Sequence, residues 1–431
     1  MTPTDRERAL AAAQSFDNTK AEFLEHEFET YDLLREHLPV AQIEVAPLMP
    51  GAPGSTPYVL TRYSDVSEVL RNTDDFSSRI DIYPVRPWIP QAIDPPEHTA
   101  YRRILNPWFT VDAMRDLEPH IEAYAEKLLD AMLERDAFDL VADFADPLPT
   151  VIFCELMGFP DDDYNRIMEW KNIVMHAADG HSRGRAAAFA KAREFGLEAD
   201  EAKPMDPMVS LQVRARTAAQ VYAYFGELLA RRRADPADDL ISRLLSAQYE
   251  GKRALTQEEL EDTMFLLFMA GLDTVASVIG LIVRGFALDA AKRREFVGLI
   301  EDPKRLDPAV EELVRYHAIV TAPRRVTREL RLRDVALAKG DIVACVTQAA
   351  NRDGEEFERR DELVFDRAPN RHAGFGIGPH RCLGIHLARR ELRIGLRALH
   401  RRLPDYRLHP DRPPELFGGM KGVSSLWLVK G

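Results

Sequence analysis

The sequence predicts a mainly α-helical fold with small β-sheets, which places it in the α+β class. One observation is a stretch from 263 to 283 that is almost entirely apolar and has helical character. A second is that no Gly/Ser-rich or Pro-rich linker divides the 431 residues, so a single domain over 1–431 is expected. The third is a set of short alternating apolar runs, which are typical of strands. These β-rich parts are expected near 40–63, 325–350 and 405–431.

The bulk composition limits the classes of partner and compartment. Lys and Arg number 57 against 70 Asp and Glu, and the net charge of −13 argues against nucleic acid and anionic membranes as partners. Cys154, Cys345 and Cys382 are far apart, so they do not form a disulfide framework, and they fit a reducing compartment. The first residues are polar and charged, without a signal or anchor pattern. A soluble, cytoplasmic protein with no membrane anchor is therefore expected.

The N-terminal half is predicted to consist mostly of helices. Asp94 is expected to be the N-cap of one of them because prolines follow it, and His98 and Arg102 then share a face of that helix. The interval 176–217 is longer and more polar than a connection between two helices needs, and 195–210 within it is predicted to be a flexible excursion. Further helices are predicted over 5–37, 111–135, 147–178 and 218–233.

The apolar stretch belongs to a longer predicted helix, which begins after a capping box at Thr256 and Glu259 and continues to about Asp289. A stretch of this length is also long enough to span a membrane. Asp273 at its midpoint, the acidic entry and the absence of flanking topology signals argue against a span. A buried helix at the centre of the fold is therefore expected.

The middle of this helix reads Ala270-Gly-Leu-Asp-Thr274. Gly271 costs about 1 kcal/mol inside a helix, and the Thr274 hydroxyl can bond the carbonyl of Ala270 and bend the axis. A buried acid beside a buried hydroxyl is costly unless it is used. Two interpretations follow from the residues: a satisfied polar pair in the core, or a proton relay beside a reactive centre.

Near the C-terminus, the run Phe375-Gly-Ile-Gly-Pro-His-Arg-Cys382-Leu-Gly384 places a lone cysteine just before a predicted arginine-rich helix. A cysteine at such a position is expected to have a lowered thiol pKa, because backbone N–H groups and the helix dipole favour negative charge. A thiolate can be a nucleophile, a zinc ligand or an axial haem ligand. Zinc would need more Cys or His at short spacing, and a nucleophile would need a base, for which His380 is too close in sequence to be unstrained.

The pattern Phe-x-x-Gly-x-His-x-Cys-x-Gly resembles the haem-binding loop of the cytochrome P-450 family. The Ala270–Thr274 run matches the oxygen-activation motif of the same family, about 110 residues earlier. The resemblance covers essentially the whole chain and implies that haem b lies between the long central helix and the cysteine loop. It makes Cys382 the iron ligand and Asp273 and Thr274 the catalytic pair. The other implied haem contacts are His98, Arg102, Arg324, Phe375, Gly376, His380, Gly384, Ala270 and Gly271.

The resemblance also implies supporting residues. Glu312 and Arg315, with Arg367 as a third member, match a buried trio that supports the thiolate loop. Arg324 best matches the second arginine that binds a haem propionate, and Arg325 is the alternative. The interval 176–217 corresponds to the lid over the substrate channel and is longer here than in compact bacterial members.

A haem-thiolate monooxygenase is the function that this resemblance implies. Because no flavin or iron–sulfur motif is present, electrons for O2 are expected from a two-iron ferredoxin and its NAD(P)H-dependent reductase. A neutral lipophilic substrate such as a terpenoid, steroid, fatty acyl chain or aromatic compound is expected, because the implied pocket carries no fixed charge. The pocket residues are Trp88, Ile89, Leu266, Met269, Ala270, Val320 and Thr321.

Basic residues around the cysteine form either a docking face for the acidic ferredoxin or an ordinary charged helix face. They are Arg103, Arg371, Arg381, Arg389, Arg390 and Arg393. Two other functions keep the haem. An H2O2-driven peroxygenase is disfavoured because family peroxygenases lack the acid–alcohol pair, which is intact here. A haem gas sensor or carrier predicts an effector domain, and none is visible in the sequence.

Overall fold

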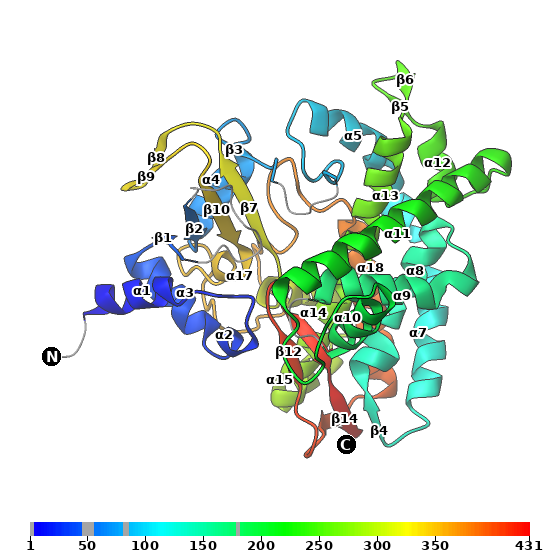
Figure 1. Cartoon of the computed structure of the whole chain (residues 1–431). Coiled ribbons are helices and arrows are strands. Elements are labelled where there is room, and N and C mark those ends of the chain that lie inside the picture. The colour runs from blue at the N-terminus through cyan, green and yellow to red at the C-terminus, as the bar shows by residue number, and fades with distance from the viewer. Residues whose placement is uncertain (1–3, 45–55, 81–85, 178–181) are drawn as a thin grey trace.

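The predicted mainly α architecture with small sheets is confirmed by the computed structural model, which describes residues 4–44, 56–80, 86–177 and 182–431. Figure 1 shows the longer helices gathered on one side of the molecule and the largest sheet on the other. The α-helices are α1 (Asp5–Gln14), α2 (Ala21–Glu25), α3 (Glu27–His37), α4 (Tyr63–Arg71), α5 (Glu97–Leu105), α6 (Val111–Arg115), α7 (Glu118–Met132), α8 (Pro147–Met157), α9 (Tyr164–His176), α10 (Ser182–Glu194), α11 (Pro207–Ala234), α12 (Leu240–Ser246), α13 (Gln257–Gly271), α14 (Thr274–Leu288), α15 (Ala290–Val297), α16 (Pro303–Tyr316), α17 (Thr347–Ala350) and α18 (Ile385–Arg402).

Short 3-10 and π turns and short strands complete the described chain. The 3-10 turns are η1 (Asn106–Phe109) and η3 (Asp161–Asp163), and the π turn is η2 (Val141–Ala145). The strands are β1 (Val40–Gln42), β2 (Pro57–Leu60), β3 (Phe76–Ser77), β4 (Ala137–Asp139), β5 (Gln248–Tyr249), β6 (Arg253–Ala254), β7 (Thr321–Val326), β8 (Leu330–Leu332), β9 (Val335–Leu337), β10 (Ile342–Val346), β11 (Tyr406–Leu408), β12 (Glu415–Phe417), β13 (Gly422–Ser425) and β14 (Trp427–Lys430).

The largest sheet of the described ranges has the strand order β1-β2-β10-β7-β3. Its central strand β10 runs parallel to β2 and antiparallel to β7, so Ile342 lies between Pro57 and Arg325. Every residue of β10 is buried, as expected for a strand that is covered on both faces. This sheet lies at the front of the molecule's β-rich side in Figure 1 and leads through β7 toward the central helices.

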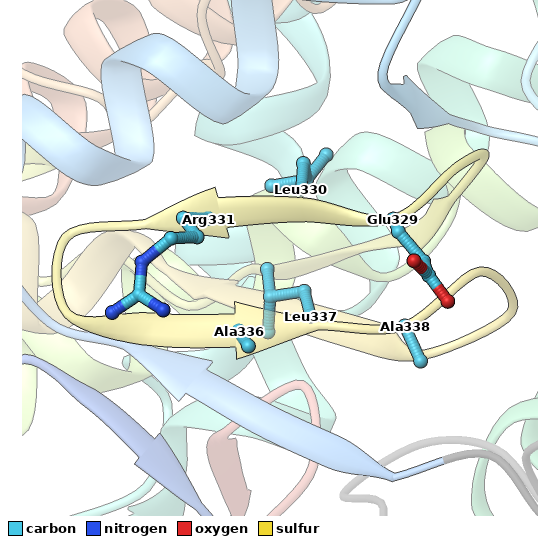
Figure 2. Close-up of a pocket in the computed structure, with 6 residues that line it drawn as sticks. All are labelled: Glu329, Leu330, Arg331, Ala336, Leu337 and Ala338. Atoms are coloured by element: carbon cyan, nitrogen blue, oxygen red, sulfur yellow. The ribbon is translucent and has the colours of Figure 1, made fainter.

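The β-rich part expected near 325–350 contains one hairpin and, after it, a strand of the largest sheet. The hairpin consists of β8 and β9, and its turn lies at Arg333 and Asp334, where Arg333 has a φ of 52°. The residues after Gly340 join the largest sheet instead, because β10 is apolar at every position and needs two covered faces. Figure 2 shows a pocket along this hairpin, which projects at the edge of the molecule in Figure 1 and is separate from the central helices.

The central helix is buried, as predicted. The segment Gln257–Leu288 is the one helical segment of the described residues that is long and apolar enough to cross a membrane, and 78% of its apolar window is buried inside the protein. The Thr256 hydroxyl accepts the Glu259 N–H at 3.2 Å and the Glu259 carboxylate accepts the Thr256 N–H at 2.7 Å, so the predicted capping box is present. Helices α7, α8, α16 and α18 contribute apolar residues to the same core cluster. The apolarity of this helix therefore serves the core of the fold.

The predicted restart of a helix at 218 is wrong, because α11 begins at Pro207. The Asp206 carboxylate accepts the N–H groups of Met208 and Val209 at 2.8 and 3.2 Å, and proline fits the first position of a helix. The first turn of α11 therefore occupies the end of the interval 195–210, which the sequence predicts to be a flexible excursion. Between α9 and α11 the described chain adds helix α10, so the interval is long, as predicted. Ile173, Ala188 and Val213 bring these three helices together in a separate small apolar cluster.

The long helices predicted over 5–37, 111–135 and 147–178 are each interrupted. Gly158 ends α8 in the left-handed conformation, with a φ of 78°. The N-cap predicted at Asp94 is also wrong, because α5 begins at Glu97. The Asp94 carboxylate instead accepts the Ser78 N–H at 2.7 Å and thereby holds the end of β3 beside the entry to α5.

Candidate functional site

The central helix is interrupted at the place that the sequence predicted. The Thr274 hydroxyl donates a hydrogen bond of 3.1 Å to the carbonyl of Ala270, and Asp273 leaves helical geometry with φ −121° and ψ −33°. A Cβ at Gly271 would lie 2.3 Å from Cδ2 of Phe153 on α8. Glycine is therefore required here, because the aromatic ring occupies the space of a side chain.

Partly exposed positions follow one face of this otherwise buried helix. Leu266 and Thr274 are half-buried and Ala270 is exposed, whereas most of their neighbours on α13 and α14 are buried. Residues four apart lie above one another on a helix. The alcohol of Thr274 therefore lies on the same face as two of the predicted pocket residues.

Asp273 lies on the buried side and contacts basic residues of α9. Its Oδ1 accepts a hydrogen bond of 2.8 Å from Nε2 of His176 and lies 3.5 Å from Nζ of Lys171. Nζ of Lys171 also donates to Oδ1 of Asp146 at 2.8 Å. Sequence reasoning missed His176 and Lys171, since a single histidine and a single lysine in a helix carry no signal of a partner on a distant segment. His176, the first residue of the interval predicted to form the lid, therefore contacts the carboxylate of Asp273.

The cysteine loop is held by its own backbone. The N–H of Cys382 donates to the carbonyl of Phe375 at 2.8 Å, and the N–H of Gly376 donates to Ala373 at 2.8 Å. Gly376 and Gly378 have φ values of 71° and 76°, and a Cβ at Gly378 would lie 2.4 Å from the carbonyl oxygen of Leu70. At Gly378 a side chain is therefore excluded both by the positive φ of the turn and by the close approach of α4.

The predicted lowering of the thiol pKa is wrong for the thiol itself. The Cys382 side chain is exposed, but the protein atoms packed around the sulfur desolvate a thiolate, and this raises the pKa. The backbone N–H of Gly384 and the charges of Arg102, Arg381 and Arg389 act in the opposite direction without overcoming the desolvation. A metal ion bound by the sulfur would displace the proton directly.

Four nitrogen-bearing side chains converge beside this loop. The rings of His98 and His380 lie with their centroids 4.0 Å apart, and all four ring nitrogens are buried without a hydrogen-bond partner among the described residues. Burial first, and then the charges of Arg102 and Arg324, lower the pKa of His98 to about 4 and that of His380 to about 2. The cluster is an environment that favours a multivalent anion, which would supply both the acceptors and the negative charge.

The predicted trio behind the loop is in contact. Arg315 donates from Nε and from a terminal nitrogen to the two carboxylate oxygens of Glu312, each at 2.8 Å. Nε of Arg367 donates to the same carboxylate at 2.9 Å, and the side chains of Glu312 and Arg315 are fully buried. Arg315 also donates to the carbonyls of Asn351, Arg360 and Glu362, so its charge is distributed over the segment that leads into the cysteine loop.

The predicted pocket residues do not all share one environment. Trp88 and Ile89 are half-buried, and the Trp88 ring lies 6.0 Å from that of Phe265 on α13. Val320 is 36% exposed. Met269 is buried in the main core, and the buried Thr321 hydroxyl accepts a hydrogen bond of 3.4 Å from Asn18.

The basic residues near the cysteine are largely compensated by acids. Arg389 pairs with Glu311 at 2.6 Å, and Arg390 and Arg393 both pair with Glu118, at 2.9 and 2.7 Å. Arg371 lies 3.7 Å from Glu356. Within the described ranges Arg103 and Arg381 form no ion pair. The cationic surface around the loop is therefore smaller than the sequence alone indicates.

The described residues also contain no group of three His, Cys, Asp or Glu that could hold a metal ion, which leaves the zinc interpretation of Cys382 without ligands.

Comparison with known proteins identifies the family of the chain. The family model of cytochrome P450 matches residues 44–284 and 300–418. Probable cytochrome P450 127A1 of Sinorhizobium fredii is 34% identical over 383 residues, which cover 87% of this chain and 84% of the relative. Mycinamicin IV hydroxylase/epoxidase of Micromonospora griseorubida is 33% identical over 366 residues, covering 82% and 84%. The solved structure of cytochrome P450 PksS of Bacillus subtilis superposes with a TM-score of 0.79 at 28% identity and covers 96% of this chain and 100% of that chain. The chain therefore belongs to the cytochrome P450 family of monooxygenases.

Proposed function

We propose that this chain is a haem b-thiolate monooxygenase that hydroxylates a neutral lipophilic molecule with O2 and with electrons from a two-iron ferredoxin. The observation that carries the proposal is the buried pair of imidazoles, His98 and His380, without protein partners beside Arg102 and Arg324. The two propionates of haem b are anions that would satisfy these donors. Arg324 fits this role better than Arg325, because its charge acts on both imidazoles.

Further residues of the chain fit the iron and the macrocycle of haem b. Cys382 would ligate the iron, and the turns at Gly376 and Gly378 hold the sulfur at the surface of its loop. Phe375, Gly384, Ala270 and Gly271 would lie around the macrocycle. When bound, haem supplies the activation of O2 and the insertion of one oxygen atom into a C–H bond.

The acid–alcohol pair is assigned the control of protons. Thr274 presents its Oγ1 on the partly exposed face of the helix, where the hydroxyl can accept as well as donate. Asp273 lies next to it in sequence, and its Oδ1 contacts the Nε2 proton of His176. A carboxyl group positioned in this way can take a proton from the interior and pass it toward the Thr274 hydroxyl.

The substrate class follows from the lining and from the relatives. Trp88, Ile89, Leu266 and Val320 offer apolar surface without a charge. Relatives of similar identity carry names that point to bulky lipophilic molecules, among them mycinamicin IV hydroxylase/epoxidase and a methyl-branched lipid omega-hydroxylase of Mycobacterium tuberculosis. A related solved structure holds testosterone. A screen of steroids, macrolides, terpenoids and fatty acyl compounds for those that shift the ferric spin state identifies the substrate.

Replacing Thr274 with alanine tests the assignment of the pair. We expect substrate binding to persist, while product per NAD(P)H falls and hydrogen peroxide rises, because the hydroxyl that directs protons is lost. Coupling is measured as product and peroxide formed per NAD(P)H consumed with the substrate from the screen. Thr263→Ala, at a buried threonine of α13, is the matched control. Equal coupling in both variants would contradict the assignment.

The electron donor is assigned from chemistry and charge. Arg381, next to Cys382 in sequence, and Arg103 on α5 are exposed and form no ion pairs among the described residues, so they offer positive charge to an acidic ferredoxin. We expect reduction of the protein by such a ferredoxin to slow steeply between low and physiological salt, because exposed charges are screened. Stopped-flow reduction rates across a salt series measure this. A rate that does not change with salt would assign these arginines to an ordinary charged surface.

A further inference from the structure

Helix α16 carries a second glutamate next to the one in the buried trio. Oε1 of Glu311 accepts from Nε of Arg389 at 2.7 Å, and Oε2 accepts from a terminal nitrogen of Arg389 at 2.6 Å. The same Oε2 contacts Nε2 of His372 at 3.1 Å. Positions 372 and 389 flank Cys382 on either side, so one carboxylate joins the segment that enters the cysteine loop to the helix that leaves it.

The histidine in this cluster has a defined tautomer. Nδ1 of His372 accepts the N–H of Gly374 at 3.1 Å, so the neutral ring carries its proton on Nε2 and donates it to Glu311. Gly374 lies directly against α16, since a Cβ there would be 2.8 Å from Cγ1 of Val314. The start of the loop is therefore fixed against α16 both by packing and by the hydrogen bonds of Glu311.

The same cluster contacts Phe375, whose backbone is hydrogen-bonded to that of Cys382. The guanidinium carbon of Arg389 lies 5.3 Å from the ring centroid of Phe375, and the His372 ring lies 5.8 Å from it. The carbonyl of Phe375 accepts the N–H of Cys382 at 2.8 Å. Arg389 is also one of the positive charges that act on the Cys382 sulfur. Displacement of Arg389 would thus change both the packing of the loop and the charge near the thiolate.

Glu311 remains ionised across the working pH range. Burial raises the pKa of its carboxyl, but the hydrogen bonds from His372 and Arg389 outweigh burial and lower the pKa to about 2. The charge of Arg389 is therefore balanced whenever the protein is folded, and the pair is charge-assisted and bidentate, which is the strongest class of side-chain hydrogen bond.

We propose that Glu311 is a positioning residue, which joins the two ends of the cysteine loop through His372 and Arg389 and balances the charge of Arg389 beside the thiolate. This inference rests on the proposed haem-thiolate function and goes beyond it, because the trio of Glu312 holds only the segment before the loop. Its consequence is that Glu311 fixes the position of the loop that carries Cys382 and, by balancing Arg389, sets the potential at which electrons enter.

The test compares Glu311→Gln with Glu301→Gln in the holoprotein. Glu301 forms the same bidentate pair with an arginine of the same helix α18, Arg401, with one contact of 2.6 Å, but farther along the helix from Cys382. We expect Glu311→Gln to lose the thiolate-type spectrum of its reduced CO complex about tenfold faster or more, as the loss of a charge-assisted partner implies. Hydrogen exchange over 372–384 should rise in Glu311→Gln and remain at the wild-type level in Glu301→Gln.

The reduction potential separates a charge effect from a loss of packing. In Glu311→Gln the charge of Arg389 is unbalanced, so the potential should shift in the positive direction, because the reduced state carries one more negative charge. In Arg389→Gln the carboxylate is unbalanced instead, and the shift should be negative. A merely structural role would give two shifts of the same sign, whereas a charge effect gives opposite shifts that cancel in the double variant, whose potential should lie near that of wild type.

Two failures are distinguishable in this design. If wild-type protein forms no thiolate-type CO complex, the proposed function is wrong. If the wild type forms it, and Glu311→Gln matches Glu301→Gln in spectral stability, exchange and potential, the function stands and the inference about Glu311 is overturned.

Discussion

Cys382→Ala is expected to abolish the thiolate-type CO spectrum and all monooxygenase activity, while the fold is retained. The side chain is exposed and forms no part of the described apolar clusters, so its removal leaves no cavity in the core. Without the sulfur the iron has no thiolate, and the propionate contacts alone leave a haem without oxygen-activating chemistry. The measurements are the spectrum of the reduced CO complex, turnover with the screened substrate and the circular dichroism of the variant.

Cys154→Ala is the control for this prediction. Cys154 is buried in α8, and burial raises its thiol pKa to about 12, so it packs as an apolar side chain. It should retain the spectrum and lose only some stability. If Cys382→Ala kept the thiolate-type spectrum, or if Cys154→Ala lost it, the ligand assignment would be wrong.

Glu312→Gln is expected to reduce the free energy of unfolding by about 3–5 kcal/mol, because removing one partner of a buried ion pair leaves an uncompensated charge. Here two guanidinium groups depend on one carboxylate, since Arg315 and Arg367 both donate to Glu312. Arg315 is fully buried and cannot turn to solvent. Urea denaturation of the holoprotein, monitored by circular dichroism, measures the change.

Glu362→Gln is the matched control, in the loop whose carbonyl at Glu362 accepts a hydrogen bond from Arg315. Its carboxylate pairs with Arg359 at 2.5 Å, but both side chains are more than half exposed, at 54% and 55%. Exposed pairs contribute little because solvent screens them, so no measurable change in the free energy of unfolding is expected. Equal losses in the two variants would show that burial of the Glu312 pair does not determine its contribution.

The parts of the site that the sequence predicted are those encoded locally. The capping box at Thr256, the bond from Thr274 to Ala270 and the turns of the cysteine loop are set by residues within a few positions of each other. Fixed spacing is therefore enough to find them. The contact between Glu312 and Arg315 belongs to the same class, because residues three apart on a helix are neighbours.

The errors have physical causes that act over longer distances or at helix ends. The thiol pKa of Cys382 was predicted in the wrong direction, because desolvation by residues from several segments exceeds the favourable backbone N–H. The helix predicted over 218–233 begins at Pro207, because the Asp206 carboxylate caps it and proline fits its first position. The contact of Asp273 with His176 joins two distant segments that share no pattern.

Phe153 gives the interrupted helix a support on its far side. Its ring fills the place that a side chain at Gly271 would need, and it belongs to α8, most of whose residues are buried. Changes at this ring would be transmitted to the alcohol and the acid within one helical turn. Substitution of Phe153 would therefore reduce catalysis, although its ring lies in the interior and remote from any substrate. A ranking of variants by catalytic loss would place Phe153 among the residues of the reaction centre.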